Sequence, residues 1–254
     1  MTLFNVEKTI YKKKTQYNDI TVKQRGHIIT LLSPEDIIQS EINLGSPLKP
    51  HLEFNLCLLF GLLFCPAPVS ILALGLGGGV VPKILNATFP EAGVDVVEID
   101  PEMLKVAEDY FDFQVSSKLR VFIADASDFI CRTKNKYDLI VLDTYCGIDL
   151  SESVDNQFFF KECVSRLSEK GFLAANLVPL DRVLMDSRLK WLEQETGNVW
   201  LLRGITRCNE IVFAGTQPVK KSALIKNART LKKTLPFNLK TERMMKRLRR
   251  WSSA

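Results

Sequence analysis

The residues best placed to do chemistry in this chain are a glycine-rich turn and an acidic residue that follows it. The turn reads Gly-Leu-Gly-Gly-Gly over 75–79 and closes an apolar run that begins at Ser70. Glycines in such a turn let the backbone approach a ligand closely and present amide groups at the start of the next helix. Glu98 ends the next apolar run, 19 residues after Gly79, where a carboxylate can accept hydrogen bonds from ribose hydroxyls. The pair predicts a nucleoside site; tight packing of the glycines and a solvated Glu98 are the structural alternative.

Two further carboxylates end the apolar runs that follow. Asp125, at the end of the third run, can accept a hydrogen bond from an adenine amino group. Alternatively, since it directly precedes Ala126, it can cap the helix that begins there. Asp143 ends the run YDLIVLD. Because ligands of open α/β sheets bind at the carboxyl ends of the strands, Asp143 is predicted to face the group that reacts with the nucleoside. A plain strand-end carboxylate is the alternative for Asp143.

The elements that must position these residues alternate between strand and helix from Ser70 onward. Asp100 and Pro101 are typical of a helix start, as N-cap and first helical residue. The alternation predicts an α/β fold with a mainly parallel sheet of seven strands and helices on both faces. Its strands are expected at 70–75, 94–99, 119–124, 137–143, 171–177, 199–203 and 210–214, and its helices at about 80–88, 101–111, 126–133, 156–167 and 182–195.

The first fifty residues have a different pattern. Apolar runs at 20–22 and 27–32 flank a turn at Gln24-Arg25-Gly26, which predicts a β-hairpin, and a further strand begins at Ile37. An apolar helix is expected at about 51–64. Its core, 54–65, has 12 residues, whereas a membrane-spanning helix needs about 20. We therefore expect a buried helix and no membrane segment.

Charge is distributed unevenly along the chain. Residues 217–254 hold 12 of the 34 lysines and arginines and one of the 29 acids, so this tail carries +11 and the rest of the chain −6. Apolar residues recur among the cations, and Pro236 separates two predicted amphipathic helices. Either these helices dock with a solvated basic face, or the basic tail contacts an acidic surface such as nucleic acid or another subunit.

Six cysteines are scattered without the spacing of metal ligands, so no metal site is predicted. Their pattern indicates reduced thiols and a cytoplasmic location. The N-terminus lacks the long apolar core of a signal peptide. The chain is divided into an N-terminal β-strand domain at 1–50, a nucleoside-binding domain at 51–216 and the basic tail at 217–254.

The motifs LGLGGG, VEIDP, ADA and YDLIVLD together resemble the class I S-adenosylmethionine-fold transferases, with their Rossmann-like domain, and in particular the spermidine synthase (polyamine aminopropyltransferase) group. QYNDITV followed by GHIITL is similar to the N-terminal β-hairpin domain of that group, and the resemblance covers about residues 15–215. It implies cofactor-binding roles for Gly75, Gly77, Gly78, Gly79, Glu98, Asp125 and Ala126, and places Asp143 at the catalytic aspartate.

Three departures from that family bear on the donor. Gly78 stands where aminopropyltransferases carry the aspartate that holds the amine of decarboxylated S-adenosylmethionine. Cys146 replaces the second aspartate of the D-S-S-D-P motif, and His51-Leu52-Glu53 replaces Tyr-(His/Gln)-Glu. Each lost charge-assisted hydrogen bond forfeits about 1.5–3 kcal/mol. A carboxylate at position 78 would also repel the carboxylate of intact S-adenosylmethionine, so Gly78 favours the intact donor.

Three functions remain open at this point. The first is methyl transfer from S-adenosylmethionine to an amine, the second is aminopropyl transfer to a polyamine, and the third is nucleoside binding without catalysis. In either reaction Asp143 is expected to orient and deprotonate the acceptor, which is a small amine or a protein. Tyr145 is expected to shape the acceptor pocket and Glu53 to hold a cationic acceptor, although both have ordinary packing or surface interpretations. The oligomeric state is left open; a homodimer is compatible with the N-terminal hairpin and with the resemblance.

Overall fold

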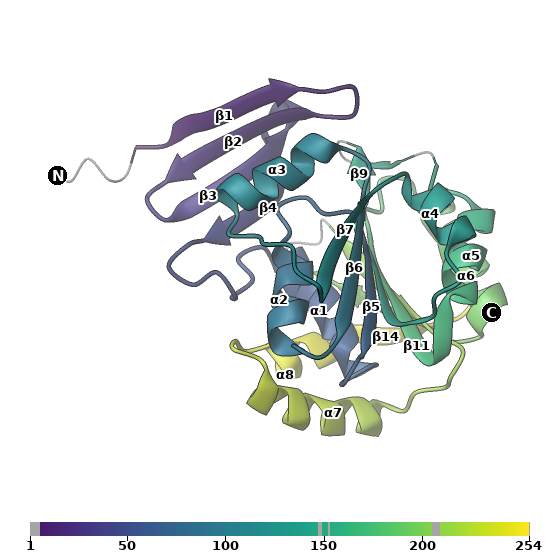
Figure 1. The fold of residues 1–254 in the computed structure, drawn as a ribbon. Coiled ribbons are helices and arrows are strands. Elements are labelled where there is room, and N and C mark those ends of the chain that lie inside the picture. The colour runs from purple at the N-terminus through teal and green to yellow at the C-terminus, as the bar shows by residue number, and fades with distance from the viewer. Residues whose placement is uncertain (1–5, 147–148, 152, 205–208, 254) are drawn as a thin grey trace.

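The computed structural model describes residues 6–146, 149–151, 153–204 and 209–253. An antiparallel N-terminal sheet lies against one end of a larger mixed sheet (Figure 1). The N-terminal sheet has the order β1-β2-β3-β4, with β1 Lys8–Lys14, β2 Asp19–Arg25, β3 Ile28–Ser33 and β4 Ile37–Asn43, and the turn η2 at Pro34–Asp36. The predicted hairpin is confirmed by the antiparallel pairing of β2 with β3. Ile20, Val22 and Leu31 lie on the buried face of this pair, as the alternation along each strand requires.

Strand β1 was not predicted from the sequence. It reads KTIYKKK, so it lacks the strict apolar alternation of a half-buried strand. Its lysines are exposed, and it pairs with β2 at the open edge of the sheet. Lysines on an edge strand discourage pairing with another chain. This role explains why β1 is rich in lysine and lacks the apolar alternation that would have predicted it.

The larger sheet has eight strands in the order β14-β12-β13-β11-β8-β5-β6-β7. Strands β11, β8, β5, β6 and β7 run parallel, while β13, β12 and β14 join antiparallel at one side. This confirms the predicted α/β class, and the strand added to the predicted seven is β14. Its strands are β5 Ser70–Leu74, β6 Gly93–Glu98, β7 Leu119–Ile123, β8 Tyr137–Leu142, β11 Leu167–Leu177, β12 Val199–Arg203, β13 Glu210–Ala214 and β14 Leu248–Trp251.

Helices cover both faces of this sheet, and a two-residue pair of short strands lies near its edge (Figure 1). On one face α4, α5 and α6 pack over Leu72, Ile140 and Leu173, and on the other α1, α2, α3 and α7 complete a second apolar core. The elements are α2 Val80–Thr88, α3 Pro101–Tyr110, α4 Ala126–Arg132, α5 Gln157–Ser165 and α6 Arg182–Thr196, with β9 Tyr145–Cys146 and β10 Asp149–Leu150.

The apolar run at 54–65 forms the helix α1, Glu53–Leu59, and the 3-10 turn η3, Phe60–Leu63. Leu58, Phe60 and Leu62 are fully buried against the sheet, so the run is the predicted core helix. Among the residues that the structure describes, none of the helices has both the length and the apolar character needed to cross a bilayer.

The C-terminal tail folds onto the body of the protein. It forms α7 Lys221–Thr234, the short helix α8 Thr241–Met245 and the edge strand β14. The prediction of a second amphipathic helix is therefore wrong beyond Met245, because backbone pairing of 248–251 with β12 satisfies the open edge of the sheet. Leu224, Leu231 and Met244 are completely buried and anchor the tail.

Since these anchors join the main core, we expect Leu231→Ala to lower the free energy of unfolding by about 2–5 kcal/mol. Ile225, on the same helix but 46% exposed, is the matched control, and Ile225→Ala should change stability by about 0.5 kcal/mol or less. Denaturant unfolding followed by circular dichroism measures both. Equal small effects would mean that the tail detaches without disturbing the core.

Candidate functional site

A cavity of about 490 Å³ opens where the carboxyl ends of β5, β6, β7 and β8 meet the N-terminal sheet. Of the residues predicted for the site, Gly75, Gly77, Glu98, Asp125, Ala126, Asp143 and Tyr145 line it. Gly78, Gly79 and Glu53 are not among its lining residues; next to Glu53, Phe54 and Asn55 of α1 take part instead. The N-terminal sheet contributes a wall that the sequence did not indicate, including Asn18, Ser33, Gln39 and Ser40.

Gly75 brings the glycine turn into contact with the strand that carries Asp143. Its φ of +96° is a backbone conformation that residues with a side chain rarely adopt. A Cβ at this position would lie 2.2 Å from the carbonyl oxygen of Asp143. Its N–H donates to the carbonyl of Val97 at 2.9 Å, and the N–H of Asp143 donates to Leu74 at 2.9 Å. Only glycine at position 75 fits, and the turn thereby lies between the ends of β6 and β8.

The remaining glycines of the turn differ in what surrounds them. At Gly78 a Cβ would lie 2.4 Å from the ring of Phe111 and 2.7 Å from Oγ of Ser40. At Gly79, the N-cap of α2, it would lie 2.3 Å from the ring of Phe113. Packing therefore accounts for these two glycines. Gly77 has φ +52° and open space around it, with the nearest atom 3.9 Å away, so it is the glycine of this trio that borders the cavity.

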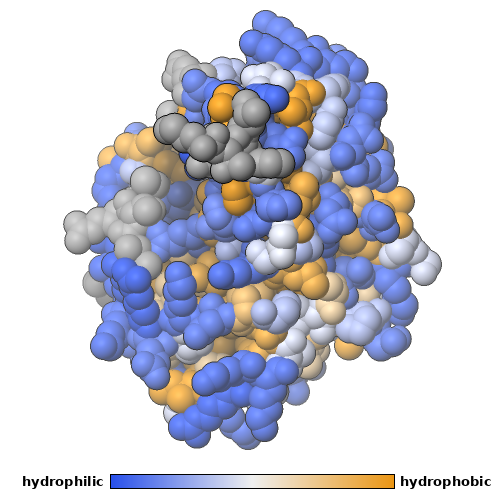
Figure 2. Space-filling view, turned by 90° about the vertical axis from the view of Figure 1, so that its left-hand side faces the viewer, coloured by the Kyte–Doolittle hydropathy of each residue, from blue (hydrophilic) through white to orange (hydrophobic). Residues whose placement is uncertain are grey.

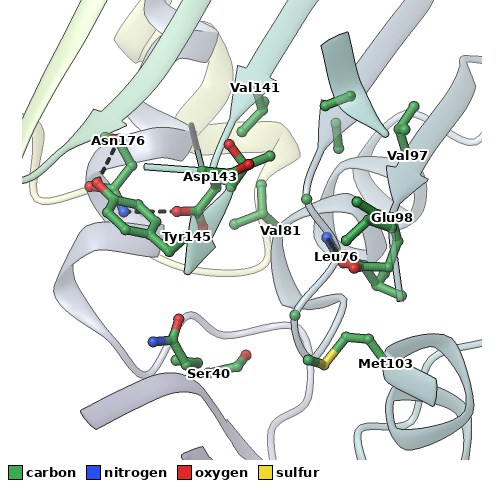
Figure 3. A pocket seen from close by; sticks show the side chains of 18 of the residues that line it. Ser40, Leu76, Val81, Val97, Glu98, Met103, Val141, Asp143, Tyr145 and Asn176 are labelled. Atoms are coloured by element: carbon green, nitrogen blue, oxygen red, sulfur yellow. Dashed lines mark hydrogen bonds between the residues drawn. The ribbon is translucent and has the colours of Figure 1, made fainter. Parts of the chain in front are cut away.

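Glu98 ties the turn to the next strand and helix. One carboxylate oxygen accepts from the N–H of Leu76, which lies beside it in Figure 3, at 3.1 Å. The other accepts from the N–H of Asp100 at 2.9 Å. The side chain is buried, and this burial raises the pKa of Glu98, whereas the two backbone donors lower it. Each oxygen retains a further lone pair, so the carboxylate can still accept hydrogen bonds from a ligand in the cavity.

Asp100 links this acid to the N-terminal sheet. As predicted, it is the N-cap of α3, where Oδ1 accepts from the N–H of Glu102 at 3.0 Å. Its other oxygen accepts from the hydroxyl of Thr15 at 2.6 Å and from Nδ2 of Asn18 at 2.8 Å. Tyr11 and Lys13 of β1 add hydrogen bonds to Glu102. The turn between β1 and β2 is thus fixed over the cavity by the same segment that carries Glu98.

The position of Asp125 is compatible with both roles that the sequence left open, the helix cap and the contact with an adenine. Oδ1 caps α4 by accepting from the N–H groups of Ser127 at 2.8 Å and Asp128 at 3.1 Å. Oδ2 accepts from the hydroxyl of Ser153 at 2.8 Å. Because the residue also lines the cavity, the capping interaction is confirmed and contact with an adenine stays a prediction.

Asp143 lies on the opposite side of the cavity from Glu98, beside Tyr145 and Asn176 (Figure 3). Its Oδ1 accepts from Nδ2 of Asn176 at 2.8 Å, and Oδ1 of Asn176 accepts from Nδ2 of Asn209 at 2.9 Å. The hydroxyl of Tyr145 donates to the main-chain carbonyl of Asn176 at 2.8 Å. Desolvation raises the pKa of Asp143 to about 6, and the hydrogen bond from Asn176 opposes that rise.

Sequence reasoning missed Asn176 and Asn209, which come from the adjacent strand β11 and the segment before β13. An asparagine inside the apolar run GFLAANL is the one sequence signal, because a buried amide needs a partner. The hydroxyl of Thr144, also at the cavity, is a buried polar group without a hydrogen-bond partner among the described residues. The site therefore has one half suited to hydroxyl groups and one half with a carboxylate positioned to accept a proton.

Comparisons with known proteins identify the family of the chain. The Spermine/spermidine synthase domain matches residues 59–190, more than half of the chain. A polyamine aminopropyltransferase from Vibrio vulnificus is 36% identical over 174 residues, which are 66% of this chain and 58% of that protein. A mouse eEF1A lysine and N-terminal methyltransferase is 33% identical over 186 residues, which are 68% of this chain and 27% of that protein. The chain thus spans well under two thirds of either relative.

A solved structure extends the comparison to three dimensions. Human Methyltransferase-like protein 13, in complex with SAH, is 28% identical, with a TM-score of 0.66, and the match covers 80% of this chain and 96% of that one. Its shared architecture includes the mainly parallel sheet described above. Since a domain model spans most of the parallel sheet and the relatives are transferases of both kinds, the chain belongs to the spermine/spermidine synthase family.

Proposed function

We propose that the protein binds S-adenosylmethionine and transfers its methyl group to an amine. The cavity has the size expected for such a ligand, since small-molecule sites occupy roughly 300–1,000 Å³. Glu98, with a free lone pair on each oxygen, would hold the ribose hydroxyls. Asp125 and Ala126 would border the adenine. The human structure that binds SAH supports this assignment by its likeness.

The close packing around Gly78 is the observation that carries the choice of the intact donor. Aminopropyl donors lack the carboxylate and end in an ammonium, which needs a negative partner to offset its desolvation. Here no side chain can extend from position 78, because Phe111 and Ser40 already occupy the place of its Cβ. The missing aspartate is therefore a feature of the packing as well as of the sequence.

The first turn of α2 supports the same choice. Val80, Val81 and Pro82 line the cavity directly after the glycine turn, so the amino end of this nine-residue helix borders the site. The helix dipole and the backbone amides at that end attract a negative group. A donor that retains its carboxylate gains from this field, whereas a donor ending in a lone ammonium is repelled by it.

Asp143 would act as the base of the reaction. The donor supplies a methyl carbon bound to a positively charged sulfur. Asp143 first takes a proton from the protonated acceptor nitrogen. The freed lone pair forms the new bond to that carbon, and the carbon–sulfur bond breaks with its electrons going to sulfur. A pKa near 6 leaves the carboxylate ionised at neutral pH and more basic than an ordinary aspartate. Asn176 holds that carboxylate in place, and Tyr145 in turn holds the backbone of Asn176.

The acceptor side favours an amine with a single positive charge. Among the described residues, the carboxylates that line the cavity are Glu98, Asp125 and Asp143, and the first two belong to the proposed nucleoside half. These residues offer no anion to the second ammonium of a diamine. We therefore infer a monoamine acceptor, either a small molecule or an amine on a protein, the latter being what the mouse relative's name states for that enzyme.

Aminopropyl transfer is the second candidate. It is favoured by the 36% identity to the Vibrio enzyme and by Asp143, since an aminopropyl acceptor also has to lose a proton. The two candidates differ in the donor, and the donor can be tested directly.

We expect intact S-adenosylmethionine to bind at least tenfold more tightly than its decarboxylated form in isothermal titration calorimetry. The reason is that the site offers the start of α2 to a carboxylate and no carboxylate to an ammonium. Tighter binding of the decarboxylated form would reverse the assignment. Absence of binding by either would leave the non-catalytic function to be judged by other nucleosides.

Glu98→Gln serves as the matched control for that titration. Its amide loses one of the two backbone interactions and weakens the ribose contact, which both donors share. Both affinities should fall by the same factor, about tenfold to a hundredfold. A selective effect on one donor would place the ribose elsewhere.

Activity should rise with pH through about 6, because Asp143 must be ionised to accept the proton. In Asn176→Ala the donor that lowers the pKa of Asp143 is gone, so the rising limb of kcat/KM should move to higher pH. Asn209→Ala is the control, because Asn209 reaches Asp143 only through Asn176. An unmoved limb in Asn176→Ala would contradict the role of Asp143.

Asp143→Asn should lower turnover by about 10²–10⁴ and leave nucleoside binding intact. The same substitution should not lower the free energy of unfolding. A carboxyl whose pKa is raised on folding favours the fold when protonated, so its contribution declines as pH rises from about 4 to 6. The neutral variant should therefore be at least as stable as wild type at pH 8, as thermal unfolding will report.

A further inference from the structure

The tail carries a cationic surface that the proposed reaction does not use. Lysines and arginines at 220, 221, 226, 229, 232, 233, 240, 243, 246, 249 and 250 are exposed, and Arg247 is half-buried. Among the described residues, none of them forms an ion pair; the ion pairs of the structure all lie between residues 7 and 210. The net charge of +11 on the tail is therefore not neutralised by ion pairs among the described residues, although Arg247 and Arg250 donate to the backbone carbonyls of Arg203 and Gly197.

This surface is held rigidly. Leu224, Leu231 and Leu235 bury the apolar face of α7, and Nδ2 of Asn227 donates to the carbonyl of Leu63 at 2.8 Å. Figure 1 shows α7 and α8 along the underside of the molecule, on the side of the large sheet away from the N-terminal sheet. In Figure 2 the lower rim of the molecule is formed largely by hydrophilic residues. The cations are thus displayed on a folded scaffold.

Lys226, Arg229 and Lys233 form a stripe on α7, because residues three and four apart share one face of a helix. With a rise of 1.5 Å per residue the 14 residues of α7 extend for about 21 Å. The cations of β14 need a separate explanation, since charged residues on an edge strand prevent pairing with other chains. This explanation does not apply to the stripe, because α7 is not an edge strand.

The stripe cannot attach α7 to a lipid surface by inserting an apolar face. Membrane-bound helices insert an apolar face beneath a charged one. In α7 that face is already buried in the protein, and Ile225 is the large apolar side chain that this helix exposes among the described residues. A partner must therefore bind through charge alone, along an extended line.

We propose that α7 binds the phosphodiester backbone of a nucleic acid. A nucleic-acid strand carries one phosphate about every 3.4 Å along its axis, so it supplies repeated negative charge over the whole length of the helix. The remaining 216 residues carry −6, so the excess positive charge of the chain lies in the tail. An acidic protein, or the acidic body of a second copy, would be a different partner and is an outcome of the test.

Fluorescence anisotropy of the full chain with a labelled 20-nucleotide RNA and with a duplex DNA of the same length tests this proposal. We expect binding at 50 mM salt to at least one of them, with log Kd depending linearly on log salt concentration. The two arms tell whether a single strand or a duplex supplies the phosphates. No binding to either at 50 mM salt would overturn the proposal.

The triple variant Lys226→Gln, Arg229→Gln, Lys233→Gln should weaken binding by about tenfold or more and reduce the salt slope for RNA by about 2. The matched control removes the same charge from exposed lysines of β1, as Lys8→Gln, Lys12→Gln, Lys14→Gln, and should leave binding near wild type. An equal loss in the control would reduce the effect to net charge and overturn the assignment to α7. So would sedimentation showing that the stripe drives self-association instead. Unchanged binding of SAH by the triple variant verifies its fold.

Discussion

The buried carboxylate of Glu98 is the interaction on which the site depends. It lies at the end of β6 and is held without any cation, by the N–H groups of Leu76 and Asp100. A carboxylate taken out of water is strongly disfavoured unless such donors replace its hydration. Both donors belong to segments that must bend sharply, one into the glycine turn and the other into α3. The acid therefore fixes the shape of the cavity at the same time as it offers acceptors to a ligand.

The hydrogen bonds of Glu98 are connected to the N-terminal sheet through one further residue, Asp100. The N–H of Asp100 donates to the carboxylate of Glu98, and the carboxylate of Asp100 accepts from two side chains of the turn at 15–18. The N-terminal sheet consequently becomes a wall of the cavity, with Ser40 beside Gly78 and with Asn18, in the turn before β2, among the residues that line it. Movement of that sheet would alter the geometry of Glu98, because the hydrogen bonds form a continuous chain between them.

Local chemistry decides how much of this could be predicted from the sequence. The strands at 70–74 and 93–98 and the caps Asp100 and Asp125 were predictable, because apolar runs and helix starts depend on neighbouring residues. Asn176 and Asn209 were not, since their partners come from elements 33 residues apart. Strands β1 and β14 also escaped prediction: both are sheet edges rich in cations, and their pairing is determined by the strand beside them.

Position 78 illustrates what the structure adds to a motif. The sequence alone states that an aspartate is absent, which a compensating acid from elsewhere would make harmless. The structure shows Phe111 and Ser40 in the volume that such a side chain needs. Phe111 is itself fully buried at the end of α3, which starts from Asp100. Restoring a carboxylate at 78 would thus require moving the helix that Glu98 anchors. The absence of an acid at position 78 therefore depends on the same helix that Glu98 fixes, and not on one residue alone.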